Sequence, residues 1–188
     1  LNVPQRTLVD VAPEIGVAEP DPEIQELIVE SPGVNLGSDF LPGSLTYSPA
    51  GEWQPAAELA AKVVWLDAFT MNVDRTPRNP NLLVWHEDLW LIDHGAALYQ
   101  QHAGLDVAKA GGAFPQIAEH VLLPRASEVA AAGDAMVAAI GEEGVGEAVE
   151  AVPSEWFAGT APSVYVDYLT ARLEQRAGFE GEADAARG

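Results

Sequence analysis

Residues 72–95 read NVDRTPRNPNLLVWHEDLWLIDHG, and our expectation for the fold starts from them. The first ten of these residues include two prolines, three asparagines and two arginines, a composition typical of a rigid loop. Two four-residue apolar or aromatic runs follow, at residues 82–85 and 89–92. The three residues between these runs suit a tight hairpin connection. The stretch therefore predicts a rigid loop that leads directly into a β-hairpin.

The two ends of this hairpin carry oxygen ligands. Antiparallel pairing brings the residue that enters the first strand and the residue that leaves the second to the same end, so Asn79 and Asp93 are expected to face one point. Mg²⁺ in proteins prefers oxygen donors and often takes one or two of them, with phosphates and water completing its shell. We therefore predict that Asn79 and Asp93 bind Mg²⁺ together with the phosphates of a nucleotide.

Asp74 lies five residues before Asn79, the same interval that separates the catalytic Asp from the metal-binding Asn in the protein-kinase catalytic loop. This spacing predicts that Asp74 orients an attacking hydroxyl or accepts its proton. Asn79 and Asp93 would hold Mg²⁺ on the phosphates of ATP, in a reaction where positioning and electrostatics supply most of the rate. Gly95 completes an Asp-x-Gly turn after the hairpin.

Two arginines, Arg75 and Arg78, fall within this loop of a very acidic chain. Beside a phosphate site they would neutralise phosphate or substrate charge, and we take Arg75 with Asp74 as the catalytic candidates. The alternative is that the arginines pair with Asp67, Asp74 or acidic helices. Both interpretations stay open at the level of sequence.

The motifs N-V-D-R-T-P-R-N-P-N-L-L and L-W-L-I-D-H-G resemble the active-site segment of HipA-like kinases, a branch related to phosphatidylinositol kinases and, more distantly, to protein kinases. The resemblance is close over residues 33–43 and 65–99 and weak over the C-terminal part. It implies a protein kinase-like fold in which Asp74 is the catalytic Asp and Asn79 and Asp93 are the metal ligands.

The same resemblance points to residues 39–42. Asp39, Phe40 and Leu41 resemble the hinge between the two kinase lobes, where backbone groups contact adenine, so they are the remaining cofactor-binding candidates.

The chain also departs from the family pattern. His94 stands where Phe is common in the middle of the Asp-Phe-Gly turn, and Thr76 stands where many phosphatidylinositol kinases have His. No Gly-rich phosphate loop and no strand-borne nucleotide lysine can be found, since the lysines are Lys62, in a predicted helix, and Lys109, in a loop. Because the sequence begins Leu-Asn-Val-Pro without Met, we expect most of the N-terminal lobe to be absent.

Composition restricts the classes of partner. The chain has 188 residues and 48% hydrophobic content, enough for one domain or lobe. With 29 acidic and 9 basic residues its formal net charge is -20, which repels nucleic acids and anionic membrane surfaces. The absence of cysteine, of a signal peptide and of an apolar run of about 20 residues favours a soluble, cytoplasmic protein.

Outside the central stretch the pattern predicts alternating short elements and then helices. A strand is expected at residues 7–11, and a strand that runs into a turn at Pro42-Gly43 is expected within residues 34–44. Helices are expected near residues 20–29, 55–69, 113–122, 127–140, 144–151 and 163–176. The small, charged tail at residues 178–188 is expected to fray. The histidines His86, His102 and His120 lack metal-ligand spacing and are expected on the surface or in loops.

These observations predict an α+β, protein kinase-like fold with three parts. Residues 1–42 would be a remnant of the N-terminal lobe and the hinge, residues 43–177 a mainly helical catalytic lobe with a short β-hairpin, and residues 178–188 a flexible tail. The expected function is an ATP- and Mg²⁺-dependent phosphotransferase acting on a hydroxyl. The family resemblance favours a protein Ser or Thr, although a lipid inositol or a small molecule presents the same group.

Two other functions stay open. A degenerate kinase-like module would bind a partner protein through the acidic helical half without catalysis. A Mg²⁺-dependent hydrolase could use Asp and Asn on a hairpin, but it would not need the hinge-like strand.

Overall fold

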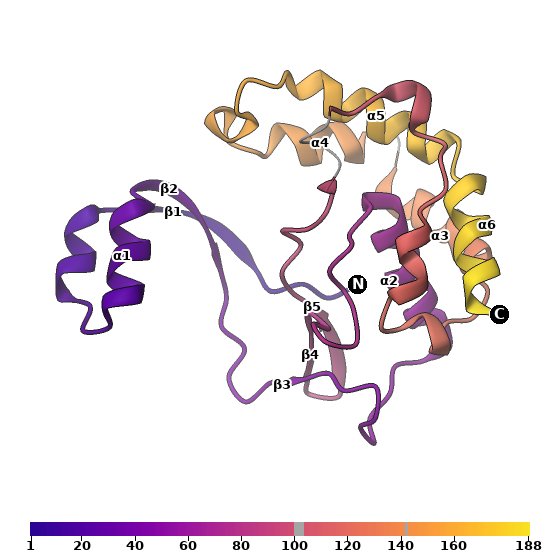
Figure 1. The fold of residues 1–188 in the computed structure, drawn as a ribbon, viewed down its shortest axis with the longest axis horizontal. Coiled ribbons are helices and arrows are strands. Elements are labelled where there is room, and N and C mark those ends of the chain that lie inside the picture. The colour runs from indigo at the N-terminus through magenta and orange to yellow at the C-terminus, as the bar shows by residue number, and fades with distance from the viewer. Residues whose placement is uncertain (100–103, 142) are drawn as a thin grey trace.

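The chain folds as a mixed α+β protein. We describe residues 1–99, 104–141 and 143–188 of a computed structural model of it (Figure 1). The strands are β1 (Arg6–Val11), β2 (Gly33–Ser38), β3 (Leu45–Thr46), β4 (Leu82–Trp85) and β5 (Asp88–Leu91). The α-helices are α1 (Pro22–Glu30), α2 (Ala57–Thr70), α3 (Val129–Ile140), α4 (Gly144–Glu150), α5 (Pro162–Glu174) and α6 (Ala177–Arg187). Short 3-10 helices are η1 (Pro13–Ala18), η3 (Val107–Lys109), η4 (Pro115–Glu119), η5 (Leu123–Arg125) and η6 (Ser154–Phe157).

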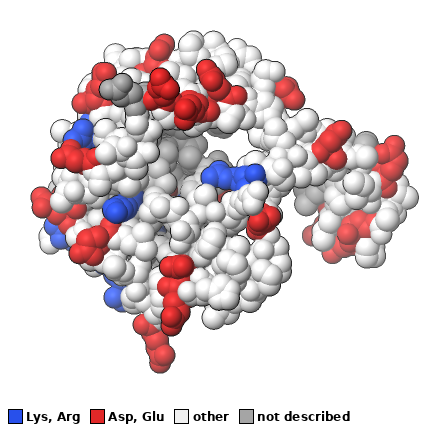
Figure 2. All heavy atoms as spheres, turned by 180° about the vertical axis from the view of Figure 1, so that it is seen from behind, with Lys and Arg blue, Asp and Glu red and all other residues white. Residues whose placement is uncertain are grey.

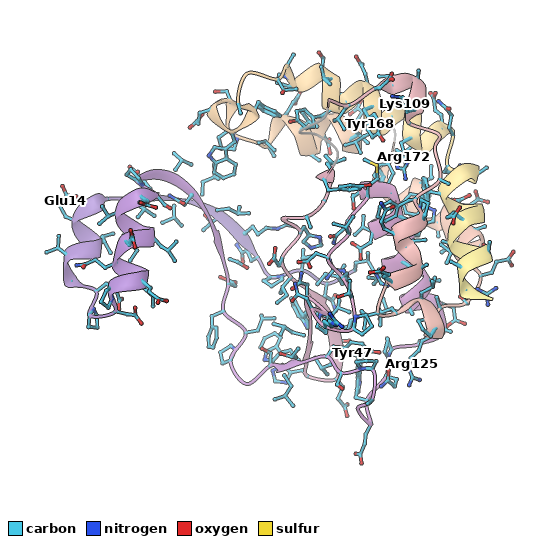
Figure 3. All side chains as sticks on the ribbon, viewed as in Figure 1. Glu14, Tyr47, Lys109, Arg125, Tyr168 and Arg172 are labelled. Atoms are coloured by element: carbon cyan, nitrogen blue, oxygen red, sulfur yellow. The ribbon has the colours of Figure 1, made fainter. Side chains whose placement is uncertain are left out.

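Residues 6–38 form a projecting unit that we call the N-terminal arm. Its strands β1 and β2 pair antiparallel from Arg6 opposite Ser38 to Val11 opposite Gly33. The chain between them forms η1 and α1, which pack on each other at the far end of this ribbon, where Glu14 lies (Figures 1 and 3). Helix α1 begins at a clear signal, since the Asp21 side chain accepts a hydrogen bond from the N–H of Glu23. The predicted first strand and helix are confirmed, and the second strand is present but ends at Ser38, before the turn at residues 42–43. The 3-10 helix η1 was not predicted.

The predicted hairpin is also confirmed, one residue shorter in its connection than expected. Strands β4 and β5 pair from Leu82 opposite Leu91 to Trp85 opposite Asp88, and β3 adds to the other edge of β4. His86 and Glu87 form the two-residue turn with φ of 51° and 65°. Positive φ at both central residues is the geometry of the type I′ turn that matches strand twist.

Helix α2 is the centre of the hydrophobic core. Because it is packed by α3, α5, α6 and the 3-10 segments η4 and η5, its apolar residues are buried on several faces. Trp65 stacks on Phe69 at 5.4 Å between ring centroids and meets Phe179 of α6 edge-on at 5.5 Å. Arg172 of α5 points toward the end of α2 (Figure 3), where its guanidinium donates to the carbonyls of Ala68 and Phe69, each at 2.8 Å. The Phe69 carbonyl thereby gains a partner that the helix end does not supply, and the Ala68 carbonyl adds this bond to one from the N–H of Met71 at 3.4 Å.

The expectation that residues 178–188 fray is wrong. They belong to helix α6, in which Phe179 is fully buried. The Glu180 side chain accepts a 2.7 Å hydrogen bond from the Trp65 indole, and both Asp184 carboxylate oxygens accept N–H groups at the start of α3. One large apolar residue and two polar anchors therefore fix a segment whose composition alone indicated disorder.

Two further findings complete the fold. The helix expected near residues 113–122 is replaced by the 3-10 segments η4 and η5, because Pro115 and Pro124 begin new turns there. In the part of the chain that the structure describes, no helix combines the length and the apolar character needed to cross a bilayer.

Candidate functional site

The loop between α2 and β4 is held in one conformation by its own hydrogen bonds. Met71 ends α2 in the left-handed region with φ of 54°, and the N–H of Asn72 returns to the carbonyl of Asp67 at 2.9 Å. Farther on, the backbones of Thr76 and Asn79 bond to each other in both directions, at 3.1 and 3.2 Å. The prediction of a rigid loop is confirmed by this closed turn.

Asp74 lies at the centre of the loop, next to Asn79. Its Oδ2 accepts hydrogen bonds from the side-chain amides of Asn79 at 2.7 Å and Asn81 at 3.2 Å. Its own N–H is bound by the Asn72 side chain at 3.2 Å. Among the described residues none hydrogen-bonds to Oδ1 of Asp74, which is partly exposed. One carboxylate oxygen is thus fixed and the other is available to a substrate hydroxyl.

The contact also orients Asn79. Only the amide nitrogen of Asn79 can donate to the Asp74 carboxylate, so the amide oxygen is turned away from it. Asn79 is exposed, and its oxygen is the atom that a hard cation would bind.

Asp93 lies directly after the open end of the hairpin. The N–H of Ile92 donates to the carbonyl of Asn81 at 3.1 Å, which extends the β4–β5 ladder by one pair toward the loop. Asp93 then turns the chain with φ of 46°, and its Oδ1 accepts the N–H of Gly95 at 3.1 Å. A Cβ on Gly95 would lie 3.2 Å from that oxygen, so the turn favours glycine. The hairpin therefore brings Asp93 next to the strand end that Asn81 enters, but no hydrogen bond in the described part of the chain joins Asn79 to Asp93, and the expectation that the two face one point stays a prediction.

Arg75, a predicted catalytic residue, does not reach the surface. Its side chain is fully buried and its Nε donates to Oδ2 of Asp67 at 2.5 Å. Its Nη1 donates to the carbonyl of Asn81 and, at 3.4 Å, to that of Ile92. Of the two interpretations left open, pairing with Asp67 is the one that the structure supports. Arg75 ties the loop to the open end of the hairpin and is a positioning residue.

Asp67 is the centre of the buried network beside the loop, and the sequence indicated it only as a possible partner of the arginines. It is fully buried on α2 and accepts side-chain hydrogen bonds from Asn72 at 3.0 Å, Arg75 at 2.5 Å and His120 at 2.9 Å. Burial alone would raise the pKa of the Asp67 carboxyl, but the hydrogen bonds and charges of His120 and Arg75 outweigh it and lower this pKa. The available signal was an acid inside the apolar run of residues 63–69.

His120 lies in a loop, as expected, but it is not on the surface. It follows η4, its ring is buried against Asp67, and its Nδ1 accepts the N–H of Leu122 at 3.0 Å. His86 lies in the hairpin turn and is exposed. His102 lies outside the described residues.

His94 is half-buried beside the Asp93 turn. Its Nδ1 lies 3.4 Å from Nη2 of Arg75, and since arginine can only donate, Nδ1 is the acceptor there. Burial first, and the charge of Arg75 second, lower the pKa of the His94 imidazole. Its Nε2 is buried and has no hydrogen-bond partner among the residues that the structure describes.

A cavity of about 460 Å³ opens between the N-terminal arm and the Asp93 turn, a volume within the roughly 300–1,000 Å³ of small-molecule sites. One wall is made by the start of the chain and the arm, the other by the end of β5 and the turn. The lining residues are Val3, Pro4, Arg6, Leu36, Ser38, Leu91, Ile92, Asp93, His94 and Gly95.

The predicted hinge residues, 39–41, directly follow Ser38, which lines this cavity. The N–H of Asp39 donates to the carbonyl of Gln5 at 2.9 Å, Phe40 is 84% exposed, and Leu41 is buried. Among the described residues no hydrogen bond uses the carbonyl of Asp39 or the N–H of Leu41. These two backbone groups are left without a partner in this part of the chain, and Leu41 itself is 7% exposed.

The donor set bears on the predicted metal. Over residues 1–99, 104–141 and 143–188 there is no group of three or more His, Asp or Glu residues arranged to hold an ion. A pair consisting of one amide and one carboxylate oxygen does not make a complete protein cage. It fits Mg²⁺ that arrives with phosphate oxygens and water.

We compared the chain with protein-family models, curated proteins and solved structures. None of the three comparisons found a match. Any function of the site therefore has to be inferred from the geometry of its own residues.

Proposed function

We propose that this protein is an ATP- and Mg²⁺-dependent phosphotransferase with a kinase-like arrangement of its site. The observation that carries the proposal is the 2.7 Å contact between Asp74 and Asn79. This contact uses Oδ2 of Asp74 and the amide nitrogen of Asn79. Oδ1 of Asp74 is then left for a substrate hydroxyl, and the amide oxygen of Asn79 for a metal ion. The extended β4–β5 ladder, which places Asp93 at the end nearest this loop, supports the same assignment.

The reaction follows from these groups. A substrate hydroxyl bound at Oδ1 of Asp74 attacks the γ-phosphorus of ATP and passes its proton to that carboxylate. The bond from the γ-phosphorus to the β–γ bridging oxygen breaks, and ADP leaves. Mg²⁺, when bound at Asn79 and Asp93, supplies charge neutralisation of the phosphates. The expected acceptor is a Ser or Thr hydroxyl of a protein.

The backbone groups of residues 39–41 support a nucleotide as the ligand. The carbonyl of Asp39 and the N–H of Leu41 are two residues apart in an irregular segment, and we expect them to pair with one edge of adenine. The apolar residues Leu36, Leu91 and Ile92 line the neighbouring cavity and suit the flat base or the ribose. A hydrolase of a small phosphate ester would need neither feature.

Isothermal titration calorimetry with ATP, with and without Mg²⁺, tests the proposal together with transfer of labelled γ-phosphate to a protein mixture. We expect Mg²⁺-dependent binding and label transfer by the wild-type protein. Asp74→Ala should abolish transfer and retain Mg²⁺-dependent binding, whereas Asp93→Ala should lose both. Binding without transfer would favour the degenerate module, and the absence of Mg²⁺-dependent binding would overturn the kinase proposal.

A further inference from the structure

The N-terminal arm contributes one cation to the cavity beside Asp93. Arg6 begins β1 and lies opposite Ser38 of β2, and both residues line the cavity. Directly opposed residues of an antiparallel pair project to the same face of the ribbon. The arm thus presents a guanidinium and a hydroxyl to the same space that Asp93 and His94 enter from the other wall.

Arg6 and Arg78 are the two arginines whose side chains bond to no residue in the described part of the chain, and of these two Arg6 lines this cavity and Arg78 does not. Arg125 donates to the carbonyl of Pro49 at 3.3 Å. Arg75 and Arg172 are buried and bonded inside the protein, and Arg176 and Arg187 form ion pairs with acids. Arg6 is exposed, and it forms no hydrogen bond or ion pair with a residue that the structure describes. In a chain with 29 acidic residues and a net charge of -20, an arginine without an acidic partner at the edge of a cavity is available to an anion.

The charge of Arg6 acts on the cavity. Arg6 and His94 line the same space. The cavity therefore has a positive end near Arg6 and apolar walls at Val3, Leu36 and Leu91. A ligand with an anionic part and a flat, less polar part matches this division.

We propose that Arg6 binds the phosphates of the nucleotide and takes the place of the strand-borne lysine that the sequence lacks. This inference rests on the proposed function, because it needs a nucleotide whose metal is held at Asp93. A planar guanidinium matches two phosphate oxygens at once, and Arg6 approaches from a strand on the wall opposite the metal turn. Phosphate would then lie between Arg6 on the arm and Mg²⁺ at Asn79 and Asp93.

Calorimetry with two probes distinguishes a contact between Arg6 and the phosphates from a general effect of the substitution on ligand binding. Mg²⁺-ATP and adenosine are each titrated into the wild-type protein, Arg6→Ala, Arg6→Lys and the control Lys109→Ala. Lys109 is an exposed cation outside this cavity, with its side chain 82% exposed, so it matches the change in net charge. Loss of a charge-assisted hydrogen bond predicts about 10- to 100-fold weaker Mg²⁺-ATP binding by Arg6→Ala. Adenosine binding should be unchanged in every variant, and Arg6→Lys should recover part of the loss.

The outcomes are distinguishable. If the wild-type protein binds Mg²⁺-ATP and Arg6→Ala binds it equally well, the role of Arg6 is overturned while the proposed function stands. An equal loss for adenosine and Mg²⁺-ATP, or an equal loss in Lys109→Ala, would also overturn it, because neither reports a phosphate contact. If the wild-type protein does not bind Mg²⁺-ATP, the proposed function fails first and the role of Arg6 fails with it.

Discussion

The N-terminal arm and the body around α2 are built in opposite ways. In the arm, Leu8, Ile15 and Leu27 are 52%, 56% and 64% exposed, and α1 has no buried residue. In the body, Trp65 and Leu122 are fully buried. The arm is stabilised by backbone pairing and a helix cap, whereas the body is stabilised by burial of residues far apart in sequence.

The same division runs through the candidate site. The loop of residues 72–81 and the turn at Asp93 belong to the body and are joined through the buried side chain of Arg75, while the cavity wall with Arg6 and Ser38 belongs to the arm. From residue 7 to residue 38 the arm carries seven acids and neither Lys nor Arg, and in Figure 2 its far end shows acidic and no basic side chains. We infer that chemistry is anchored in the body and that nucleotide contacts from the arm are more adjustable.

The largest expected effect comes from Arg75. Replacing Arg75 by Ala leaves Asp67 buried without its arginine partner and releases the carbonyls of Asn81 and Ile92. Breaking a buried charge pair by removing one partner typically costs about 3–5 kcal/mol. Urea unfolding should therefore show a large fall in the midpoint for Arg75→Ala.

Arg78 provides the matched control, because it is an exposed arginine of the same loop. Arg78→Ala should change the free energy of unfolding by no more than about 0.5 kcal/mol. If the two variants unfold at the same urea concentration, the buried network is not what stabilises this loop.

The second prediction compares one substitution in the two regions. Leu122→Ala removes a fully buried side chain from the body and should reduce the free energy of unfolding by about 2–5 kcal/mol. Leu27→Ala removes a side chain that is 64% exposed on α1 and should cost about 0.5 kcal/mol or less. The measurement is thermal or urea unfolding followed by circular dichroism. Similar losses in both variants would mean that the arm is packed in solution.

Local sequence signals predicted the arm and the loop well. Turn residues and alternation located β1, β2 and the β4–β5 hairpin, and the five-residue interval predicted that Asp74 and Asn79 act together. These features depend on neighbours within a few residues, which a sequence displays directly. The kinase-like fold itself stays a prediction.

Contacts between residues far apart in the chain cannot be predicted from local sequence patterns. The role of Asp67 depends on His120, which is 53 residues away, and the order of α6 depends on Phe179 and Glu180 meeting Trp65. Composition assigned the tail to disorder because it averages over residues and cannot see one aromatic side chain enter a core. Arg75 was given a catalytic role for a similar reason, since its spacing placed it near phosphate and only packing shows that it points inward.

A third, smaller effect is expected at Gly95. Its substitution by Ala places a Cβ 3.2 Å from Oδ1 of Asp93, so the carboxylate must shift. We expect a several-fold loss of Mg²⁺-dependent ATP binding, with a stability change of about 1 kcal/mol or less. Gly146→Ala is the control, since nothing lies within 4 Å of the added Cβ. If Gly95→Ala binds Mg²⁺-ATP as tightly as the control, the exact position of the Asp93 carboxylate does not matter for binding.

The smallest effect concerns the pH dependence of stability through His94. Burial and the charge of Arg75, with a further contribution from Arg6, lower the pKa of His94, and these outweigh the opposing charges of Asp67 and Asp93. As the pH falls below the ordinary value of 6.5, the unfolded chain takes up the proton first, so the folded state loses stability until the pH reaches the lowered pKa. In His94→Asn this loss is absent, and all other titrating groups are common to both proteins. The stability of the wild-type protein relative to His94→Asn should therefore decline between pH 7.5 and pH 5, measured by urea unfolding at each pH. Parallel curves would show that His94 titrates alike in the folded and unfolded chain, and that Arg75 and the cavity wall do not exclude its charged form.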